Sequence, residues 1–254
     1  MRIVAIIQAR MNSTRLPGKV LVNIAGVPML QRIIDRVSVT PSVDKVIVAT
    51  SDIKENDKLC EWLGGFPDVG LFRGSENDVL DRFYKCAKYH KADVIVRITA
   101  DDPLKDASII EYAVNYLLAR THLDYCSNTI LSTYPEGLDI EIMRFSALER
   151  AWKEAILHSE REHVTPYIWK NQNLFNIHNF EYSKNLSSWR WTVDKPIDIS
   201  FMERVFTRFK EEPLVNFEKV IDFLECNPEI IEINQGIPRN EGYLKSVDSE
   251  VKKN

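Results

Sequence analysis

Three cationic side chains, Arg10, Arg15 and Lys19, lie close together in the segment QARMNSTRLPGK, residues 8–19. Polar side chains and backbone N–H groups between such cations can cradle phosphate oxygens, whose charge the cations neutralise. Gly18 lets the backbone approach a ligand closely. The spacing is that of neither a Walker A loop, because Lys19 is followed by Val20, nor the Rossmann glycine pattern. The segment predicts a phosphate-binding loop, with a solvated basic loop as the alternative.

Two neighbouring carboxylates, Asp101 and Asp102, follow the apolar run VIVRI in the segment ITADDPL. Mg²⁺ prefers hard oxygen ligands and is commonly held by one or two carboxylates together with substrate phosphates. Asp-Asp-Pro is also a favourable turn sequence, and the two roles are compatible. A third carboxylate, Asp194 in RWTVDKPID, precedes a predicted helix. It is either a metal ligand or an N-cap, with Pro196 and Asp198 in the first turn.

The elements that must position these residues alternate between strands and helices through the first half of the chain. Apolar β-branched runs predict strands at 2–8, 44–50 and 93–98. Amphipathic stretches predict helices at 27–38, 52–64, 76–89 and 106–119. This order implies right-handed crossovers and an α/β fold with a doubly wound, mostly parallel sheet. Ligands bind at the carboxyl ends of the strands in such sheets, where the cationic segment and Asp101 are both expected.

The second half of the chain is less regular. Alternation over 138–143 predicts a half-exposed strand, which is also a candidate dimer arm. Further patterns predict helices at 145–156, 160–171, 195–210 and 216–226, and strands at 174–180 and 189–193. We therefore expect a single domain over 1–240, in which about 125–190 form a small inserted lobe for the acceptor or for dimerisation. A loose polar tail is expected over 241–254.

Composition narrows the class of protein. The chain has 254 residues, 44% of them hydrophobic, and a formal net charge of −4. This is enough for one large α/β domain, and the absence of a basic excess argues against nucleic-acid binding. The apolar run Ile3–Ile7 is too short for a signal peptide or a membrane span. The four cysteines form no CxxC pair, so we expect a cytoplasmic protein with free thiols and no membrane partner.

The segment QARMNSTRLPGKVL closely resembles the signature loop of the cytidylyltransferases that make CMP-activated acidic sugars. These include the 3-deoxy-manno-octulosonate (KDO) and acylneuraminate cytidylyltransferases, and the nearest resemblance is to the branch of the spore coat polysaccharide biosynthesis protein SpsF. The resemblance covers most of residues 1–210, through FRGSENDVLDRF, VRITADDPL, PEGLDIEI, SEREHVTPY and RWTVDKPIDI. It implies a Rossmann-like nucleotide-diphospho-sugar transferase fold and a nucleotidyltransferase domain.

The resemblance also implies roles for particular residues. Asp101 matches the metal-binding aspartate of the KDO enzymes, Asp194 matches their second metal ligand, and Asp198 is a further candidate for the Mg²⁺ cofactor. Arg10 and Lys19 join Asp101 and Asp194 as the catalytic set. The nucleotide-binding set implied for CTP is Gln8, Ala9, Arg10, Asn12, Ser13, Arg15, Lys19, Ser51, Arg73, Ser75, Asp78 and Arg82.

Some of these residues also have purely structural interpretations. Ser75 and Asp78 have capping-box spacing, and Asp78 and Arg82 are one helical turn apart. Seven polar residues, two in the first half and five in the second, are candidates for binding a small anionic acceptor, with solvent exposure as the alternative for those of the second half. They are Arg97, Asp102, Asp139, Glu141, His163, Arg190 and Thr192.

The chemistry expected from these features is in-line substitution at the α-phosphorus of CTP, with an acceptor oxygen attacking and pyrophosphate leaving. Positioning and electrostatics dominate such transfers, so no general base is assigned. Three alternatives stay open: a nucleotide-sugar-dependent glycosyltransferase, a non-catalytic nucleotide sensor, and a cytidylyltransferase acting on a phosphorylated or phosphonate acceptor. A homodimer is an additional open option.

Overall fold

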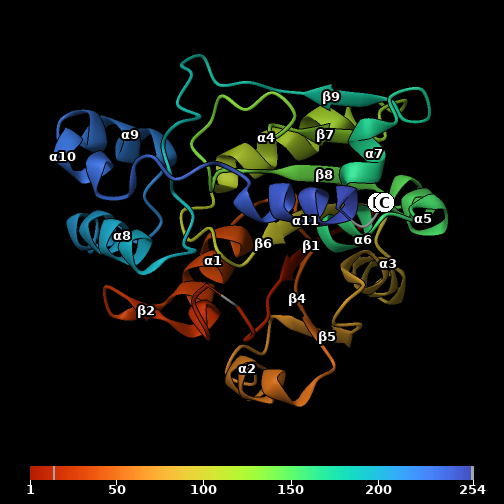
Figure 1. The fold of residues 1–254 in the computed structure, drawn as a ribbon, viewed down its shortest axis with the longest axis horizontal. Helices are drawn as coiled ribbons and strands as arrows, with labels where there is room; N and C mark the ends of the chain where they lie inside the picture. The colour runs from red at the N-terminus through yellow and green to blue at the C-terminus, as the bar shows by residue number, and fades with distance from the viewer. Residues whose placement is uncertain (14, 253–254) are drawn as a thin grey trace.

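The computed structural model describes residues 1–13 and 15–252 and is built around a seven-stranded sheet with the order β5-β4-β1-β6-β8-β7-β9 (Figure 1). A separate two-stranded ribbon pairs β2 with β3. The strands are β1 (Ile3–Gln8), β2 (Asn23–Ile24), β3 (Val27–Pro28), β4 (Lys45–Ser51), β5 (Gly70–Gly74), β6 (Val94–Thr99), β7 (Tyr125–Ser127), β8 (Glu141–Arg144) and β9 (Ile177–Asn179).

Helices flank the sheet and connect its strands. The α-helices are α1 (Met29–Ser38), α2 (Asp57–Leu63), α3 (Val79–Tyr89), α4 (Ala107–Leu118), α5 (Phe145–Glu154), α6 (His158–His163), α7 (Pro166–Lys170), α8 (Pro196–Arg208), α9 (Phe217–Glu225), α10 (Pro228–Ile231) and α11 (Glu241–Val251). Short 3-10 helices are η1 (Lys19–Leu21), η2 (Lys54–Asn56) and η3 (Glu232–Asn234). In the described ranges, none of these helices combines the length and the apolar character needed to cross a lipid bilayer.

The first four strands of the sheet order run parallel to one another. β1 pairs in parallel with β4 on one side and with β6 on the other, and β4 pairs in parallel with β5. Their carboxyl ends therefore lie at one edge, which carries the loops that begin after Gln8, Ser51, Gly74 and Thr99. β8 is antiparallel to both β6 and β7, and β7 is parallel to β9. The predicted α/β fold with a mostly parallel sheet is confirmed.

Alternate residues of each central strand supply the cores on the two faces of the sheet. Ile3, Ala5 and Ile7 of β1 pack in the core formed with α1, α4, α8 and α9. Val4 and Ile6 pack in the opposite core, formed with α3 and α5. Burial on both faces explains why these strands are apolar without alternation.

The second half of the chain differs from the predicted elements in three places. The segment predicted as a half-exposed strand at 138–143 is buried, because β8 lies inside the sheet between β6 and β7 and not at a free edge. This placement contradicts its use as a dimer arm. The predicted helix 160–171 is two helices, α6 and α7, separated at Val164, whose φ is 71°. The predicted strand 189–193 forms a single bridge, between Glu136 and Arg190.

The region expected as an inserted lobe, residues 125–190, joins the main sheet. It contributes β7, β8 and β9, which extend the parallel part of the sheet to its far edge. Gly137 lets this region pack closely on the 189–193 segment, since its φ is 108° and an added Cβ would lie 2.4 Å from the Trp191 carbonyl oxygen. The acceptor and dimerisation roles of the region stay predictions.

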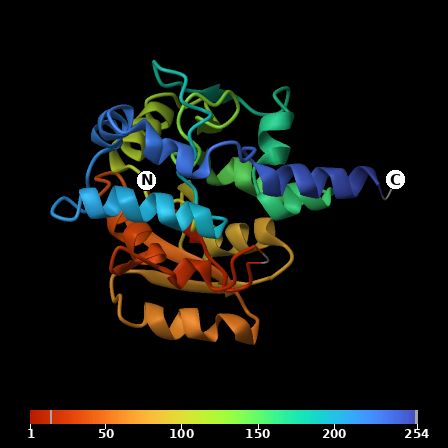
Figure 2. The same cartoon turned by 60° about the vertical axis from the view of Figure 1, so that its left-hand side comes forward.

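Residues 241–251 of the segment expected as a loose tail form a docked helix instead, and residues 253–254 lie outside the described residues. α11 begins at Glu241 and packs on α6, where Glu250 accepts hydrogen bonds from the Ser159 backbone N–H at 2.5 Å and from the Ser159 hydroxyl at 2.9 Å. Ser246 lies 3.0 Å from Nε2 of His163. Figure 1 shows α11 crossing in front of the sheet, and Figure 2 shows it running outward to the C-terminus. Polar composition misled the prediction, because these contacts with α6 are themselves polar.

Candidate active site

The loop that follows β1 folds back on itself before it enters η1. The Gly18 N–H donates to the Met11 carbonyl at 2.9 Å, and Gly18 has a left-handed φ of 72°. The loop is tied to a neighbouring one, because the Met11 N–H donates to Asn56 Oδ1 at 2.8 Å. Ser13 Oγ accepts from the Leu16 N–H at 3.3 Å and so stabilises the loop itself. Asn12 is exposed, and Thr14 lies outside the described residues.

This turn places Lys19 between the two predicted metal ligands. Lys19 Nζ lies 3.1 Å from Asp101 Oδ2, 2.8 Å from Asp194 Oδ1 and 3.1 Å from the Val193 carbonyl oxygen. Burial raises the pKa of Asp101, but the adjacent Lys19 ammonium outweighs it and brings the pKa to about 2. Burial lowers the pKa of Lys19, and the two carboxylates raise it above its ordinary value. Asp101 and Lys19 are therefore both charged at neutral pH.

The geometry fits a magnesium ion at this point. Asp101 and Asp194 come from distant loops, yet each places an oxygen within 3.1 Å of a single cationic group. No group of three or more His, Cys, Asp or Glu able to hold a metal occurs among residues 1–13 and 15–252. Two carboxylates are enough for Mg²⁺ when substrate phosphates and waters complete its octahedral shell.

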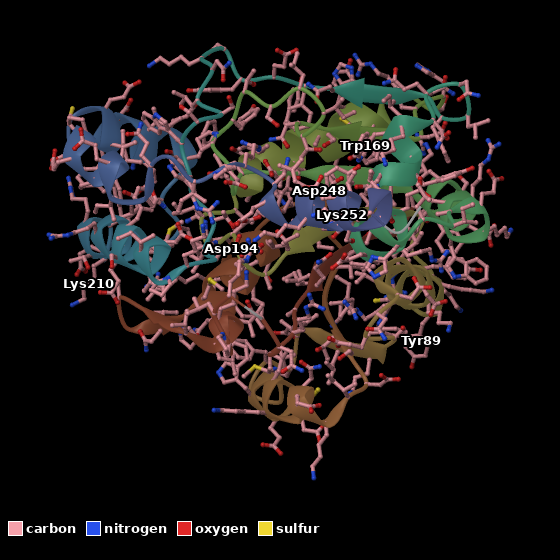
Figure 3. The ribbon with its side chains drawn as sticks, viewed as in Figure 1. Tyr89, Trp169, Asp194, Lys210, Asp248 and Lys252 are labelled. Carbon is pink, nitrogen blue, oxygen red and sulfur yellow. The ribbon has the colours of Figure 1, made fainter. Side chains whose placement is uncertain are left out.

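Arg15 lies next to the same carboxylates. Its Nη2 donates to Asp194 Oδ1 at 2.6 Å, and its Nη1 donates to Glu241 Oε2 at 3.1 Å. Glu241 opens α11 and was not among the predicted site residues. Figure 3 shows Asp194 close to the start of α11. The C-terminal helix therefore reaches the predicted phosphate site.

Asp198 is buried behind Asp194, which it holds in place, and does not line the site. It is fully buried and accepts from the backbone N–H groups of Asp194 and Lys195 at 2.9 and 2.8 Å. Arg190 Nε donates to Asp198 at 2.9 Å, and Arg190 Nη1 donates to Glu136 at 2.9 Å. The structure thus gives Asp198, predicted as a metal ligand, and Arg190, predicted as an acceptor contact, positioning roles beneath the site.

Asp102 is also held within the protein. Thr99 Oγ1 donates to Asp102 Oδ2 at 2.6 Å, and Lys105 Nζ lies 2.8 Å from the same oxygen. Burial raises the pKa of Asp102 to about 6, even though Lys105 acts in the opposite direction. Of the two neighbouring aspartates, Asp101 is the one that faces Lys19 and the predicted metal position.

A cavity of about 540 Å³ opens beside these groups. Its lining combines groups from the carboxyl ends of β1 and β6, from loops of the second half, and from the start of α11. The predicted site residues that line it are Gln8, Arg15, Arg97, Asp101, Asp102, Asp139, Glu141, His163, Thr192 and Asp194.

Glu141 anchors one wall of the cavity through three donors. Tyr125 OH donates to it at 2.6 Å, Thr165 Oγ1 donates at 2.5 Å, and Arg97 Nη1 forms a short ion pair with it. Burial raises the pKa of Glu141, but Arg97 and the other donors outweigh it, so the net pKa is lowered. Arg97 Nη2 also donates to Gln8 Oε1 at 3.2 Å, which joins the β1 loop to the second half of the chain.

A smaller cavity of about 110 Å³ lies on the other side of Gln8. Its lining includes Ala9, Arg10 and Arg82, together with His163. Arg82 is buried and donates to the Ser75 carbonyl at 2.6 Å, and burial lowers its pKa to about 10. Arg10 contacts Glu76 at 3.3 Å rather than Asp101 or Asp194. Four residues predicted to bind nucleotide therefore meet here, apart from the Lys19 cluster.

Four further residues predicted to bind nucleotide lie in neither cavity. Arg73 donates to the Ser51 and Ile53 carbonyls at 3.2 and 2.9 Å and pairs with Asp57 at 2.7 Å. Ser51 Oγ accepts from Asn56 Nδ2 at 2.5 Å. The other two act at the start of α3, where Ser75 Oγ accepts from the Asp78 N–H and Asp78 caps the helix and pairs with Arg161. These contacts hold the loops that surround the cavities. The structural interpretation of Ser75 and Asp78 at a helix start agrees with this, whereas the expected pair of Asp78 with Arg82 does not form among the described residues, because Asp78 pairs with Arg161 and Arg82 donates to the Ser75 carbonyl.

His163 is expected to make stability depend on pH. Burial lowers its pKa to about 4, whereas the unfolded chain has a histidine pKa of about 6.5. Between these values the unfolded state binds more protons, so the free energy of unfolding falls as pH falls from about 6.5 to 4. We expect the wild type to lose up to about 3 kcal/mol in this window relative to His163→Gln. Urea unfolding of both proteins from pH 7 to 4.5 measures this, and parallel curves would contradict it.

Several lining residues carried no signal in the sequence. Glu136 comes from an irregular segment, Trp169 comes from α7, and residues 239–244 come from the start of α11 and the turn before it. The buried, hydrogen-bonded Glu136 lies between the Asn240 N–H and Arg190, and burial raises its pKa to about 7. Contacts between segments about 100 residues apart leave no periodic pattern in a single sequence.

Comparison with known proteins agrees with this geometry. The family model for cytidylyltransferases matches residues 4–232. An uncharacterized protein of Methanocaldococcus jannaschii is 41% identical over 252 residues, which cover 96% of this chain and 98% of the relative. The spore coat polysaccharide biosynthesis protein SpsF of Bacillus subtilis is 32% identical over 235 residues, 89% of this chain and 95% of SpsF.

A solved structure extends the match to three dimensions. The structure of a cytidylyltransferase from Leptospira borgpetersenii matches with a TM-score of 0.88 and 32% identity, over 94% of this chain and 100% of that chain. The resemblance read from the loop and from the acidic motifs is therefore confirmed over nearly the whole length. The chain belongs to the cytidylyltransferase family and is a nucleotidyltransferase enzyme.

Proposed function

We propose that this protein transfers CMP from CTP to a small acidic sugar and releases pyrophosphate, in a reaction that requires Mg²⁺. The observation that carries the proposal is the convergence of Lys19, Asp101 and Asp194 within 3.1 Å, beside Arg15 and at the side of the 540 Å³ cavity. This arrangement supplies both the carboxylates for a divalent cation and the cations for a triphosphate.

The protein's own residues divide the work between charge and position. Asp101 and Asp194 would hold Mg²⁺, which when bound offsets the charge that develops on the phosphate oxygens. Lys19 and Arg15 neutralise the triphosphate and the leaving pyrophosphate. Asp198 and Arg190 keep Asp194 in place through their buried ion pair. Positioned charges of this kind are what in-line phosphoryl chemistry requires most.

The two cavities suggest where the substrates bind. We assign the cytidine to the small cavity lined by Ala9, Arg10 and Arg82, because Gln8 joins it to the phosphate loop. We assign the acceptor to the large cavity, whose 540 Å³ falls in the range of small-molecule sites. Arg97 and the carboxylates around it can bind both the charge and the hydroxyl groups of an acidic sugar. The relation to SpsF supports a product used in surface polysaccharide synthesis.

The test is pyrophosphate release, measured with each of the four nucleoside triphosphates in the presence of Mg²⁺. Each triphosphate is paired with KDO, N-acetylneuraminate, other acidic sugars, and phosphorylated or phosphonate small molecules. We expect release that depends on acceptor, occurs with CTP alone and stops when EDTA removes the metal. Release only with a phosphorylated or phosphonate acceptor would overturn the acidic-sugar assignment but keep the CMP transfer. Failure to bind CTP would overturn the transfer itself.

A further inference from the structure

One wall of the large cavity is made by a single short segment, residues 239–244, at the start of α11. The family model ends its match at residue 232, so this wall lies beyond the region that the model describes. The metal and phosphate groups come from residues 8–19, 101 and 194, inside the matched region. This separation suggests that the region matched by the family model carries out the nucleotide chemistry, and that the wall at 239–244 contributes to the choice of acceptor.

Arg239 fastens this wall to the loop before β8. Its Nη1 donates to the Tyr134 carbonyl at 3.0 Å, and its Nη2 forms a short ion pair with Asp139. The next residue, Asn240, has a left-handed φ of 56° and donates its N–H to Glu136 Oε1 at 2.9 Å. Arg239 is thus held at the cavity by its own contacts, and its side chain is 16% exposed.

The cavity contains two other guanidinium groups, and both have partners that hold them firmly. Arg97 pairs with Glu141, which Tyr125 and Thr165 also hold through hydrogen bonds. Arg15 pairs with Asp194 and Glu241 at the phosphate site. Arg97 therefore holds the cavity wall in place, and Arg15 is assigned to the triphosphate.

The carboxylate that pairs with Arg239 is held less firmly. Among the described residues, Arg239 is the one side chain that donates to the Asp139 carboxylate, while Lys105 Nζ binds the Asp139 backbone carbonyl at 2.5 Å. Burial also raises the pKa of Asp139 above its ordinary value, so ionisation is disfavoured where it stands. The Nε atoms of Arg239 and of Arg97 are both buried without an acceptor in the described part of the chain, so the loosely held Asp139 partner is what distinguishes Arg239 from Arg97. Of the three arginines that line the cavity, Arg239 can therefore turn its guanidinium group to an incoming anion at the lowest cost in free energy.

We propose that Arg239 binds the carboxylate of the acceptor, which displaces Asp139, and that this contact makes the enzyme select acidic acceptors. The proposal rests on the proposed function, because it assigns a residue to the acceptor of that reaction. A bidentate guanidinium–carboxylate pair provides both charge and direction. The displaced Asp139 stays beside the acceptor, where its oxygens can accept from sugar hydroxyl groups.

Aromatic residues give the same wall an apolar part. Tyr243 and Trp169 both line the cavity, with ring centroids 5.9 Å apart. Figure 3 shows Trp169 beside α11. Such rings pack against the C–H face of a sugar. The wall therefore fits a ligand with a carboxylate at one end and an apolar ring face at the other.

The experiment compares each acidic sugar that supports pyrophosphate release with its methyl ester, in the wild type and in Arg239→Ala. We expect Arg239→Ala to lower kcat/KM for the free acid about 100-fold, as the loss of a buried charged pair does. The ester should change little, so the ratio of free acid to ester falls towards one. Arg239→Lys keeps the charge but not the fork and should keep part of the preference. The Kd for CTP should stay within about twofold of the wild-type value in both variants, since Arg239 is assigned no nucleotide contact.

The matched control is Arg150→Ala. Arg150 has the same kinds of partner, a carboxylate (Glu154, 3.1 Å) and a backbone carbonyl (Leu174, 3.1 Å), but it lies outside both cavities. It should leave the ratio of free acid to ester unchanged. A purely structural Arg239 would lower the rates with acid and ester equally and lower the melting temperature, and that result overturns the proposal.

The outcomes also separate this proposal from the proposed function. A wild type that binds CTP but transfers CMP only to uncharged acceptors overturns the role of Arg239 and leaves CMP transfer standing. A wild type that does not bind CTP overturns the proposed function directly.

Discussion

Asp101→Asn is expected to lower kcat for pyrophosphate release on the order of 10³-fold, because it removes a charged ligand from the proposed metal position. The substitution keeps the size of the side chain, so packing should be preserved. It also removes one of the two carboxylates that pair with Lys19 at about 3 Å. The Mg²⁺ concentration for half-maximal rate should rise together with the loss in kcat. Steady-state kinetics across a Mg²⁺ titration measures both.

Asp102→Asn is the matched control for this experiment, because it changes the adjacent carboxylate in the same way. Asp102 is bound by Thr99 and Lys105 inside the protein, so its loss should affect stability more than the Mg²⁺ requirement. The assignment of the metal to Asp101 is wrong if Asp102→Asn raises the Mg²⁺ requirement and Asp101→Asn mainly lowers stability. Equal losses in both, with unchanged Mg²⁺ dependence, would also contradict it.

Lys19→Met is expected to have the second largest effect, with a loss in kcat on the order of 10²-fold to 10³-fold. The lysine neutralises the triphosphate in the proposed reaction. In the free protein its removal leaves Asp101 and Asp194 facing one another, while Arg15 and Arg190 stay paired with Asp194. Without metal the variant should lose about 2 kcal/mol of stability, less than a deeply buried pair would, because the cavity lets water screen the charges.

Added Mg²⁺ should restore much of that stability in Lys19→Met and much less in the wild type. The ion would bind only the folded state and would take the place left by the ammonium group. Melting temperatures with Mg²⁺ and with EDTA measure the difference. Lys245→Met, which removes an exposed partner of Glu241, is the control and should behave as the wild type does. An equal Mg²⁺ response in all three proteins would show that Lys19 and the metal do not share a position.

The parallel half of the fold could be predicted because its strands are apolar on both faces and its helices are amphipathic. The same rules failed at 138–143 for a physical reason. Asp139 and Glu141 alternate with buried residues as if they faced solvent, but they face an internal cavity where arginines pair with them. A polar residue on a cavity wall and one on the surface give the same sequence pattern.

The site was predictable where the chain itself brings residues to a strand end. Gln8, Arg15, Lys19, Asp101 and Asp194 all meet at one place in the structure. The pair Asp194 and Asp198 could not be separated from sequence, because both stand near one helix start. Only the buried contacts of Asp198 in the structure show that it holds Asp194 in place. Arg239 could not be found at all, since its position depends on α11 returning to the cavity.

The return of α11 has a consequence for the synthesis of the chain. The phosphate loop at 8–19 leaves the ribosome before the wall at 239–244 does. Domains fold as the chain emerges, so the sheet can form while one side of the large cavity is still missing. In this order of synthesis, a nascent chain acquires the subsite that we propose for CTP before it acquires the wall that we assign to the acceptor. An excess of CTP during translation would then favour the native arrangement of the loop that α11 must later meet.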